Sequence, residues 1–555
     1  MKTRSEALKS IANKPFDVCI IGAGATGSGC ALDAQLRGLK TALLDAGDFA
    51  GATSSASTKI VHGGVRYLEQ AVKELDSAEY HVVDRALHER VHMLKNGPYL
   101  ARPLEFLVPC FHWSDATYLD LGLKLYDWIA GKASIFPSHF INREETLRRM
   151  PTLQSEHLIG SVIYADGVFD DARYNITLVK SFADERGEAL NYARIMSFEK
   201  AADGKISAAN VEDQLTHERF VVRARAFVNA TGPFSDTVRE LANPGVRSRM
   251  RLSKGVHILL PLEVLSSQDA MLIPKTDDGR VLFAVPWMGR LLAGTTEQEV
   301  TVADELYVTA KEIDYILRHL NRYLAQAVTP DHVVSAFAGA RPLVGSGDSR
   351  DTKKLVRDDV IEIDARTGLI SIMGGKWTTH RAMAEDTINA VQKQLGAPVT
   401  LSPTRNHALI GAAGFTDDYW QKLAAEHGTS ELTARHLAAK YGTTAPEVIE
   451  LIQQDAGLAE PLCDGLAPIR AEVIFAARDE MAVTVEDFLG RRIGLQLYGW
   501  RASIRSAPVV ASLLARELGW NRAQEQEEVE KYVNKINRWL RLAALTTELD
   551  LVQEY

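Results

Sequence analysis

The sequence has few cysteines, no long apolar run and no excess of positive charge. Its 555 residues include only four cysteines, widely scattered and without a CxxC pair, so we expect neither a disulfide framework nor a metal site. The formal net charge of −9 excludes a general nucleic-acid binder from the expected classes. A composition of 46% hydrophobic and 24% charged residues is typical of a folded globular protein and argues against disorder.

Targeting and membrane-spanning signals are also lacking. Residues 1–14 are polar and of mixed charge, without the apolar centre of a signal peptide. No stretch approaches the ~20 consecutive apolar residues that a spanning helix needs. The sequence therefore predicts a cytoplasmic protein, attached at most to a membrane face.

A strand–helix–strand pattern opens the chain. Residues 16–45 read as an apolar run ending in glycines, a helical pattern, and a second apolar run that closes on Asp45. Gly22, Gly24 and Gly27 form GxGxxG, which permits a tight turn, close approach of a pyrophosphate and close packing of helix on strand. Asp45 is placed to accept hydrogen bonds from a ribose diol. The pattern predicts a bound dinucleotide but does not decide between FAD and NAD.

Two later strands end in a similar way. Residues 220–229 lead into Thr231 and Gly232, and another apolar run ends at Gly375. Each of these alone could be an ordinary strand-to-turn glycine. Together with the first motif they favour FAD, because a long buried cofactor requires the chain to return to it repeatedly with small residues.

The remaining pattern divides the chain. Residues 255–300 alternate short apolar runs with turns, as in an antiparallel sheet, whereas long helical patterns dominate beyond about residue 400. The expected fold class is α/β and α+β, with a Rossmann-type FAD-binding domain, an antiparallel-sheet substrate domain and an all-helical C-terminal domain. We expect an oxidoreductase body at 1–395 and a helical domain at 400–555. Within the body, the FAD-binding segments are expected at about 15–85, 150–250 and 340–395. The substrate segments are expected at about 86–149 and 251–339.

Several motifs carry a family resemblance. The run 52–69 (ATSSASTKIVHGGVRYLE) resembles the FAD-dependent glycerol-3-phosphate dehydrogenases, respiratory quinone-reducing enzymes of the D-amino-acid-oxidase-like flavoprotein superfamily. Further matches follow in the same order at 254–257 (KGVH), 339–343 (GARPL), 356–358 (VRD) and 374–381 (GGKWTTHR), and more loosely at 476–492. Asp45 departs from the family, which more often has Glu there, but either carboxylate can accept a ribose diol.

The resemblance implies FAD as cofactor and glycerol 3-phosphate as substrate. The cofactor contacts that it adds to the glycine motif are Ser54, Ser55, Thr58, Lys59, His62, Gly64 and Lys376. A phosphate dianion needs fixed cations, and the planar fork of arginine suits phosphate oxygens. Arg341, Arg66 and Arg357 are the candidates, and Tyr67 and Thr378 could add neutral hydrogen bonds.

The implied reaction removes hydride from carbon 2 to the flavin while the neighbouring hydroxyl loses a proton. His257 is the natural base because its unperturbed pKa lies near neutrality, although a satisfied core histidine is the alternative interpretation. Arg341 could share the catalytic role by holding the developing alkoxide. Lys376 fits as a donor to the flavin or the substrate.

The resemblance also implies a membrane quinone as electron acceptor, and hence contact with the bilayer surface. Two stretches, 118–129 and 529–545, are apolar or amphipathic enough to dock there, although such stripes more often pack inside a protein. We expect a protein peripheral to the inner face of the cytoplasmic membrane, and no nucleic acid as partner. The oligomeric state is left open, with a homodimer among the expectations.

Three other functions remain open from the sequence. The first is an oxidase of the same substrate, which would reduce O₂ to H₂O₂. The second is a related flavoenzyme acting on an amine or a hydroxy acid, which a set of several arginines disfavours. The third is a non-enzymic flavin-binding sensor or scaffold.

Overall fold

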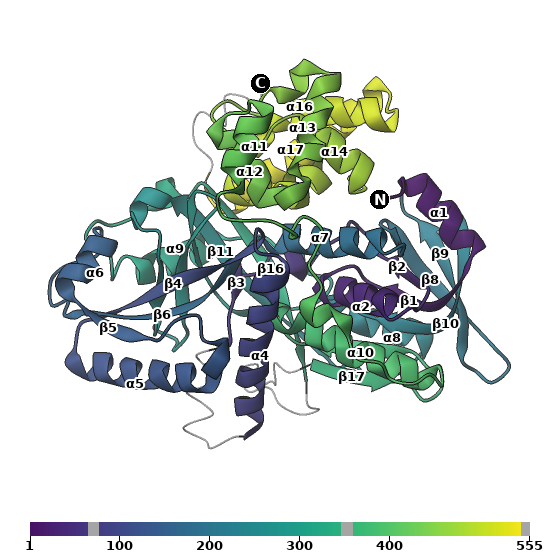
Figure 1. Cartoon of the computed structure of the whole chain (residues 1–555), viewed down its shortest axis with the longest axis horizontal. Coiled ribbons are helices and arrows are strands. Elements are labelled where there is room, and N and C mark those ends of the chain that lie inside the picture. Colours follow the sequence, from purple (N-terminus) through teal and green to yellow (C-terminus); the bar gives the residue numbers. More distant parts are fainter. Residues whose placement is uncertain (65–76, 346–358, 546–555) are drawn as a thin grey trace.

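The computed structural model describes residues 1–64, 77–345 and 359–545. For residues 77–80 it describes the backbone alone. Two sheets lie side by side in one body, and a group of helices lies above them (Figure 1). Arg66, Tyr67 and Arg357, three of the predicted substrate residues, lie outside the described residues.

The first sheet contains a parallel core with the order β18-β10-β1-β2-β7. The described strands of this sheet are β1 (Pro15–Ile21), β2 (Thr41–Leu44), β7 (Glu188–Leu190), β8 (Ala193–Lys200), β9 (Ile206–Asp213), β10 (Arg219–Asn229), β17 (Asp359–Ile363) and β18 (Ile370–Gly374). Val18 to Ile21 are all buried, as expected for a central parallel strand that is covered on both faces. The helices α2, α7 and α10 pack beside one another on this core.

The described residues of the body also form nine α-helices between and around the strands. Asp170 caps the start of α7 by accepting a hydrogen bond from the backbone N–H of Arg173, as sequence preferences at helix starts would predict. The described helices of the body are α1 (Arg4–Asn13), α2 (Ala25–Leu36), α4 (Ser77–Asn96), α5 (Trp113–Ala130), α6 (Arg143–Arg149), α7 (Asp171–Asp184), α8 (Ser235–Ala242), α9 (Ala310–Leu320) and α10 (His380–Gln394), with short 3₁₀ turns such as Thr53–Ser55.

The second sheet is largely antiparallel, and its centre is the ladder of β11 with β14 and β16. Its described strands are β3 (Ile60–Val61), β4 (Ala101–Cys110), β5 (His139–Asn142), β6 (Gly160–Phe169), β11 (Met250–Pro261), β12 (Ala270–Ile273), β13 (Leu282–Trp287), β14 (Arg290–Gly294), β15 (Gln298–Val300) and β16 (Ser335–Val344). His257 lies opposite Gly294 on one side and Phe337 on the other.

One expected boundary is wrong. Residues 160–169 were expected in the FAD-binding part, but they form β6 and pair with β3, β4 and β5 of the second sheet. Residues 60–61 likewise join the second sheet through β6. The reason is that a fully buried apolar strand fits either sheet equally well, and only its hydrogen-bonding partner decides between them.

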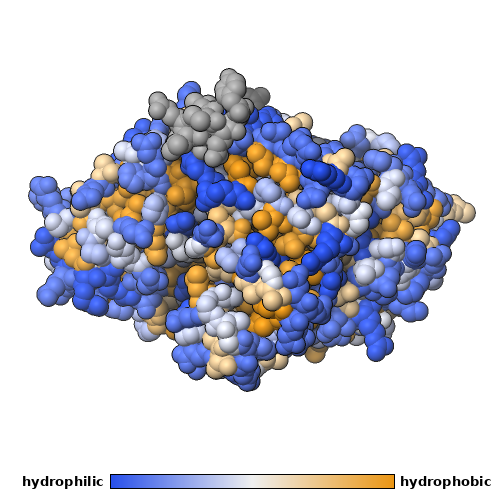
Figure 2. Space-filling model, turned by 90° about the horizontal axis from the view of Figure 1, so that it is seen from above, coloured by the Kyte–Doolittle hydropathy of each residue, from blue (hydrophilic) through white to orange (hydrophobic). Residues whose placement is uncertain are grey.

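The C-terminal domain is helical, as predicted. Its described helices are α11 (Tyr419–His427), α12 (Glu431–Tyr441), α13 (Ala445–Gln454), α14 (Ala471–Asp479), a π-helix (Asp487–Arg492), α15 (Leu495–Tyr498), α16 (Trp500–Leu518) and α17 (Arg522–Leu542). Val256, Ile258 and Leu260 of β11 share a core with Leu514 and Ile536 of these helices, so the domain covers one face of the second sheet. Seen from above, apolar side chains show in the centre, where Figure 1 places these helices, and polar ones dominate the rim (Figure 2).

None of the helices in the described part of the chain is both long and apolar enough to cross a bilayer. The predicted amphipathic stretch 529–545 falls mainly within α17, whose Tyr532, Ile536 and Leu540 are buried in the core shared with the second sheet. Its apolar face therefore packs inside the protein. The prediction that this stretch contacts the membrane is wrong.

Candidate functional site

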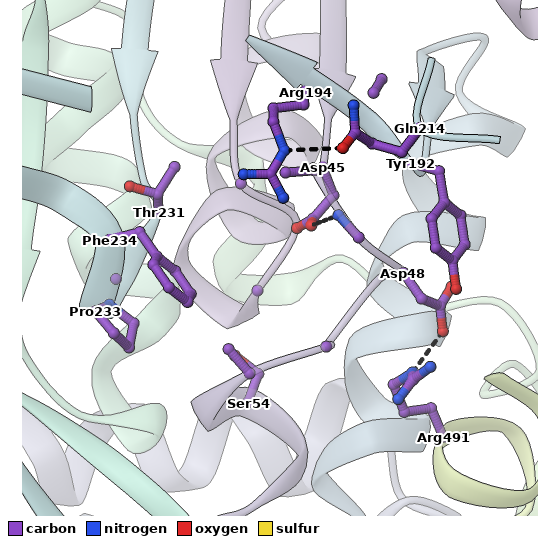
Figure 3. Close-up of a pocket in the computed structure, with 18 of the residues that line it drawn as sticks. Asp45, Asp48, Ser54, Tyr192, Arg194, Gln214, Thr231, Pro233, Phe234 and Arg491 are labelled. Carbon is purple, nitrogen blue, oxygen red and sulfur yellow. Dashed lines mark hydrogen bonds and ion pairs between the residues drawn. The ribbon is translucent and has the colours of Figure 1, made fainter. Parts of the chain in front are cut away.

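A cavity of about 1510 Å³ lies at the carboxyl ends of β1, β2, β10 and β18. Because parallel strands end at the same edge of a sheet, Gly22, Asp45, Thr231 and Gly375 line one cavity although they are far apart in the sequence. Figure 3 shows Asp45, Ser54 and Thr231 around it. The cavity exceeds the roughly 300–1,000 Å³ that is usual for small ligands, as a dinucleotide requires.

The three glycines of the first motif are each required by their surroundings. Gly22 has φ +98°, and a Cβ atom there would lie 2.7 Å from the carbonyl oxygen of Ala230. A Cβ on Gly24 would lie 2.8 Å from Ser54 Oγ, and one on Gly27 would lie 1.7 Å from the carbonyl oxygen of Gly22. The start of α2 therefore reaches the cavity without side chains at these positions: Gly24, Ala25 and Thr26 line it, and Ala25 N donates a hydrogen bond to Ser54 Oγ at 2.9 Å.

Asp45 is held by the backbone on both sides of its carboxylate. Oδ2 accepts a hydrogen bond from Ala23 N at 2.6 Å, and Oδ1 accepts one from Gly47 N at 2.9 Å. Burial raises the pKa of Asp45 to about 6, although these two N–H groups oppose the rise. The carboxylate lines the cavity and retains lone pairs for hydroxyl donors.

Two hydrogen bonds join the segments that meet around the cavity. Trp377 Nε1 donates to the carbonyl oxygen of Ser54 at 3.0 Å, and Thr53 Oγ1 donates to that of Ala340 at 2.6 Å. Lys376 and Pro342 line the cavity next to these residues. The loop after β2, the end of β18 and strand β16 therefore meet at one place, which joins the two sheets.

His257 and Arg341 lie on one face of the second sheet. In the β11–β16 ladder His257 pairs with Phe337 and Ser253 pairs with Arg341, so both side chains project from the same side. His257 stacks on Phe337 with ring centroids 5.0 Å apart. Arg341 donates to Thr295 Oγ1 at 2.8 Å and lies next to the cavity-lining Pro342.

His257 is buried, and its ring is only partly hydrogen-bonded. Nε2 lies 3.0 Å from Thr58 Oγ1, whereas Nδ1 has no hydrogen-bond partner among the described residues. Burial, the charge of Arg341 and the charge of Lys59 lower the pKa of His257 well below its ordinary value of 6.5. The imidazole is therefore neutral at physiological pH.

Several of the other predicted cofactor residues contact the protein itself and not the cavity. Lys59 is buried, and its Nζ donates to Asp171 Oδ1 at 2.5 Å and to the carbonyl oxygen of Ser55 at 2.7 Å. Neither Lys59 nor Ser55 lines the cavity. The backbone N–H of His62 donates to Thr378 Oγ1 at 3.3 Å, which brings the turn at Gly64 close to the end of β18.

Some residues of the cavity were not predicted. Tyr192 lines it from the β7–β8 turn, Arg194 from the start of β8 and Gln214 from just after β9, and Arg194 Nε donates to Gln214 Oε1 at 3.0 Å (Figure 3). Arg491 lines it from the C-terminal domain. No glycine pattern marks the first three. Arg491 lies in the run 476–492, whose looser resemblance to the family was the one feature of the sequence that could have pointed to it.

A glycine-rich turn after the first strand, a carboxylate after the second and a dinucleotide-sized cavity define a nucleotide-dependent oxidoreductase of the doubly wound type. The family described as FAD dependent oxidoreductase matches residues 17–387, and the C-terminal domain of alpha-glycerophosphate oxidase matches 402–525. The chain belongs to the FAD-dependent oxidoreductase family, and within it to the glycerol-3-phosphate dehydrogenases. The predicted family, fold class and FAD cofactor are thereby confirmed.

Relatives with different degrees of sequence identity support this family assignment. Mitochondrial glycerol-3-phosphate dehydrogenase of Bos taurus is 39% identical over 93% of this chain and 72% of its own length. The mitochondrial enzyme of Arabidopsis thaliana is 36% identical over 95% of this chain and 87% of its own. The crystal structure of glycerol-3-phosphate dehydrogenase from Bacillus halodurans complexed with FAD superposes with a TM-score of 0.78 at 30% identity, covering 98% of each chain.

Proposed function

We propose that the protein oxidises sn-glycerol 3-phosphate to dihydroxyacetone phosphate and passes the electrons to a membrane quinone. The observation that carries the proposal is the buried, neutral His257 on the same sheet face as the cation of Arg341, bonded to Thr58 of the loop whose Thr53 and Ser54 line the FAD cavity. The names of the relatives supply the substrate.

FAD, when bound, supplies the acceptor for the electron pair that leaves carbon 2. The backbone at Gly24 and Thr26, where α2 begins, suits its pyrophosphate, and Asp45 suits its ribose. Thr231, Gly232, Gly375 and Lys376 line the same cavity and would complete the site.

His257 serves as the base in this proposal. The carbon-2 hydroxyl must lose its proton as the alcohol becomes a ketone, and a neutral imidazole can accept it. In the tautomer whose Nε2–H donates to Thr58 Oγ1, Nδ1 is the nitrogen that accepts the proton. Burial keeps the imidazole neutral, helped by the charges of Arg341 and Lys59, and these two charges also favour the alkoxide form of a hydroxyl bound there.

Arg341 serves both the phosphate and the reacting end of the substrate. Its hydrogen bonds to Thr295 Oγ1 and the carbonyl oxygen of Thr296 hold the guanidinium beside β11. A guanidinium remains charged at every physiological pH and can meet phosphate oxygens in pairs. Arg66 and Arg357 stay predictions as further phosphate ligands.

We infer that the bilayer contact is made by α5. On this helix, Trp128 is 72% exposed and Leu121 is 71% exposed. Tyr118, nearer the start of the helix, is exposed as well. Figure 1 shows α5 along the lower edge of the body, on the side away from the C-terminal helices. Exposed aromatic and aliphatic side chains with Lys124 nearby suit the interface of a membrane that carries the quinone. A homodimer stays a prediction.

An oxidase is the second candidate, because the matched C-terminal domain carries the name of alpha-glycerophosphate oxidase. The oxidase structure from Mycoplasma pneumoniae shares the fold alone, with 16% identity over 71% of this chain. An oxidase would reduce O₂ to H₂O₂, so peroxide yield measured against reduction of a quinone-like dye separates the two functions.

The decisive experiment is anaerobic addition of glycerol 3-phosphate to the purified yellow protein. We expect the flavin absorbance to bleach and dihydroxyacetone phosphate to form in equal amount. An unchanged flavin spectrum would refute the proposed function.

A further inference from the structure

The C-terminal domain lines the FAD cavity with residues of α17 and with residues at and just before the π-helix, and the π-helix also reaches the turn after Asp45. The π-helix Asp487–Arg492 directs two consecutive arginines at Asp48, which is only three residues beyond Asp45. Arg491 Nε donates to Asp48 Oδ2 at 2.6 Å, and Arg492 donates to the two Asp48 oxygens at 2.7 and 2.9 Å. All three side chains are buried, and the sequence separation is 443 residues for the first pair.

The ion cluster keeps Asp48 charged inside the protein. Burial alone would raise the pKa of Asp48, but Arg492 and Arg491 lower it below its ordinary value. Breaking either contact would leave buried charges with fewer partners, which costs free energy, so the cluster resists movement. The turn from Asp45 to Asp48 is thereby fixed from the C-terminal domain.

The same segment also holds the adjacent wall of the cavity, at Tyr192. The hydroxyl of Tyr192 donates to Asp487 Oδ1 at 2.6 Å, and Arg491 donates to the same oxygen at 2.7 Å. Tyr192 N in turn donates to the carbonyl oxygen of Gly47 at 2.8 Å. Gly47 lines the cavity, as do Tyr192 and Arg491, which Figure 3 labels.

We propose that Arg491 and Asp487 form part of the FAD site and position its adenosine end. Arg491 holds the turn after Asp45 through Asp48, and Asp487 holds the turn that carries Tyr192. The two turns then keep a fixed relative position, in which the Asp45 carboxylate meets the ribose and Tyr192 closes the adjacent wall. The C-terminal helical domain then has a cofactor-binding role. FAD binding and docking of this domain are coupled, and by linkage each strengthens the other.

The test measures cofactor binding rather than activity. Apoprotein is titrated with FAD, and with ADP and FMN as probes of the two halves of the cofactor. For Arg491→Met we expect the Kd of FAD and of ADP to rise at least about tenfold, while the Kd of FMN stays within about twofold. Lys440→Met is the matched control, because Lys440 forms a buried interdomain ion pair with Asp170 at 2.5 Å and neither residue lines the cavity.

We expect Lys440→Met to lower the melting temperature of the apoprotein and leave the Kd of FAD within about twofold. Tyr192→Phe, which removes one hydroxyl, should raise the Kd of FAD and ADP about fivefold and tests the proposal if Arg491→Met does not fold. Parent-like FAD binding in the variants of Arg491 and Tyr192 would overturn the proposal. An equal loss of FMN binding, or equal loosening in Lys440→Met, would overturn it as well.

Discussion

Gly255 lies directly against the guanidinium of Arg341: a Cβ atom on Gly255 would be 2.5 Å from Arg341 Nη2. The two residues belong to neighbouring strands, β11 and β16, in which Gly255 pairs with Gly339. The guanidinium therefore rests on bare backbone, on the same face as His257.

Gly255→Ala should displace this guanidinium. Because a long side chain can move aside, we expect little loss of stability but a rise of roughly tenfold or more in the KM for glycerol 3-phosphate, with the flavin still bound. Steady-state kinetics with an artificial acceptor measures it. Gly122→Ala is the control, since a Cβ there meets no atom within 4 Å. An unchanged KM in Gly255→Ala would argue against Arg341 as a substrate ligand.

His257→Gln should remove the proposed base. We expect kcat to fall about 10²-fold or more while FAD absorbance is retained, because general base catalysis contributes that order of magnitude. His319→Gln is a matched control: His319 is equally buried but lies in α9, where Nε2 accepts a hydrogen bond from Asp277 N at 3.0 Å. Full turnover in His257→Gln would exclude the assigned role.

The pH dependence of kcat/KM should respond to Lys59. A base acts in its deprotonated form, and burial, Arg341 and Lys59 lower the pKa of His257, so activity that depends on it persists well below pH 6.5. Lys59→Met combined with Asp171→Asn removes one of these charges without leaving a lone buried carboxylate. The pKa of His257 should rise, and the acid-side loss of kcat/KM should move to higher pH, measured over about pH 5 to 8. A profile identical to that of the parent protein would count against this assignment.

FAD binding should weaken in acid. Burial raises the pKa of Asp45 to about 6, so its carboxylate is ionised above that pH and protonated below it. Since the ionised form accepts the ribose hydroxyls better, the Kd of FAD should be roughly tenfold higher at about pH 5 than at about pH 8. Asp45→Asn should bind weakly at both pH values. A pH-independent Kd in the parent protein would contradict this role of Asp45.

Membrane contact should depend on α5. Leu121→Glu or Trp128→Glu places a charge on its exposed apolar face, and we expect co-sedimentation with anionic liposomes to fall severalfold while dye-linked activity is kept. Leu401→Glu is the control, because Leu401 is 92% exposed and lies outside α5. If all three variants sediment like the parent protein, α5 is not the docking surface.

Much of the fold could be predicted from local pattern. The glycine motif, the strand ending before Thr231 and the helical C-terminal domain depend on periodicity and on residues close in sequence. The assignment of residues 160–169 failed, because an apolar strand does not encode its partner. The second membrane candidate, 529–545, failed because an amphipathic stripe fits a core as well as a bilayer.

The sequence by itself determined the dinucleotide motif, the family and the residue types that a phosphate and a hydroxyl would need. Only the tertiary structure decided that Gly255 makes room for Arg341, that Lys59 pairs with Asp171, and that Arg491 reaches Asp48. Each of these relationships joins residues distant in the chain, through strand register or domain packing. Local pattern cannot specify such contacts, because they depend on how buried surfaces and charges are matched across the whole fold.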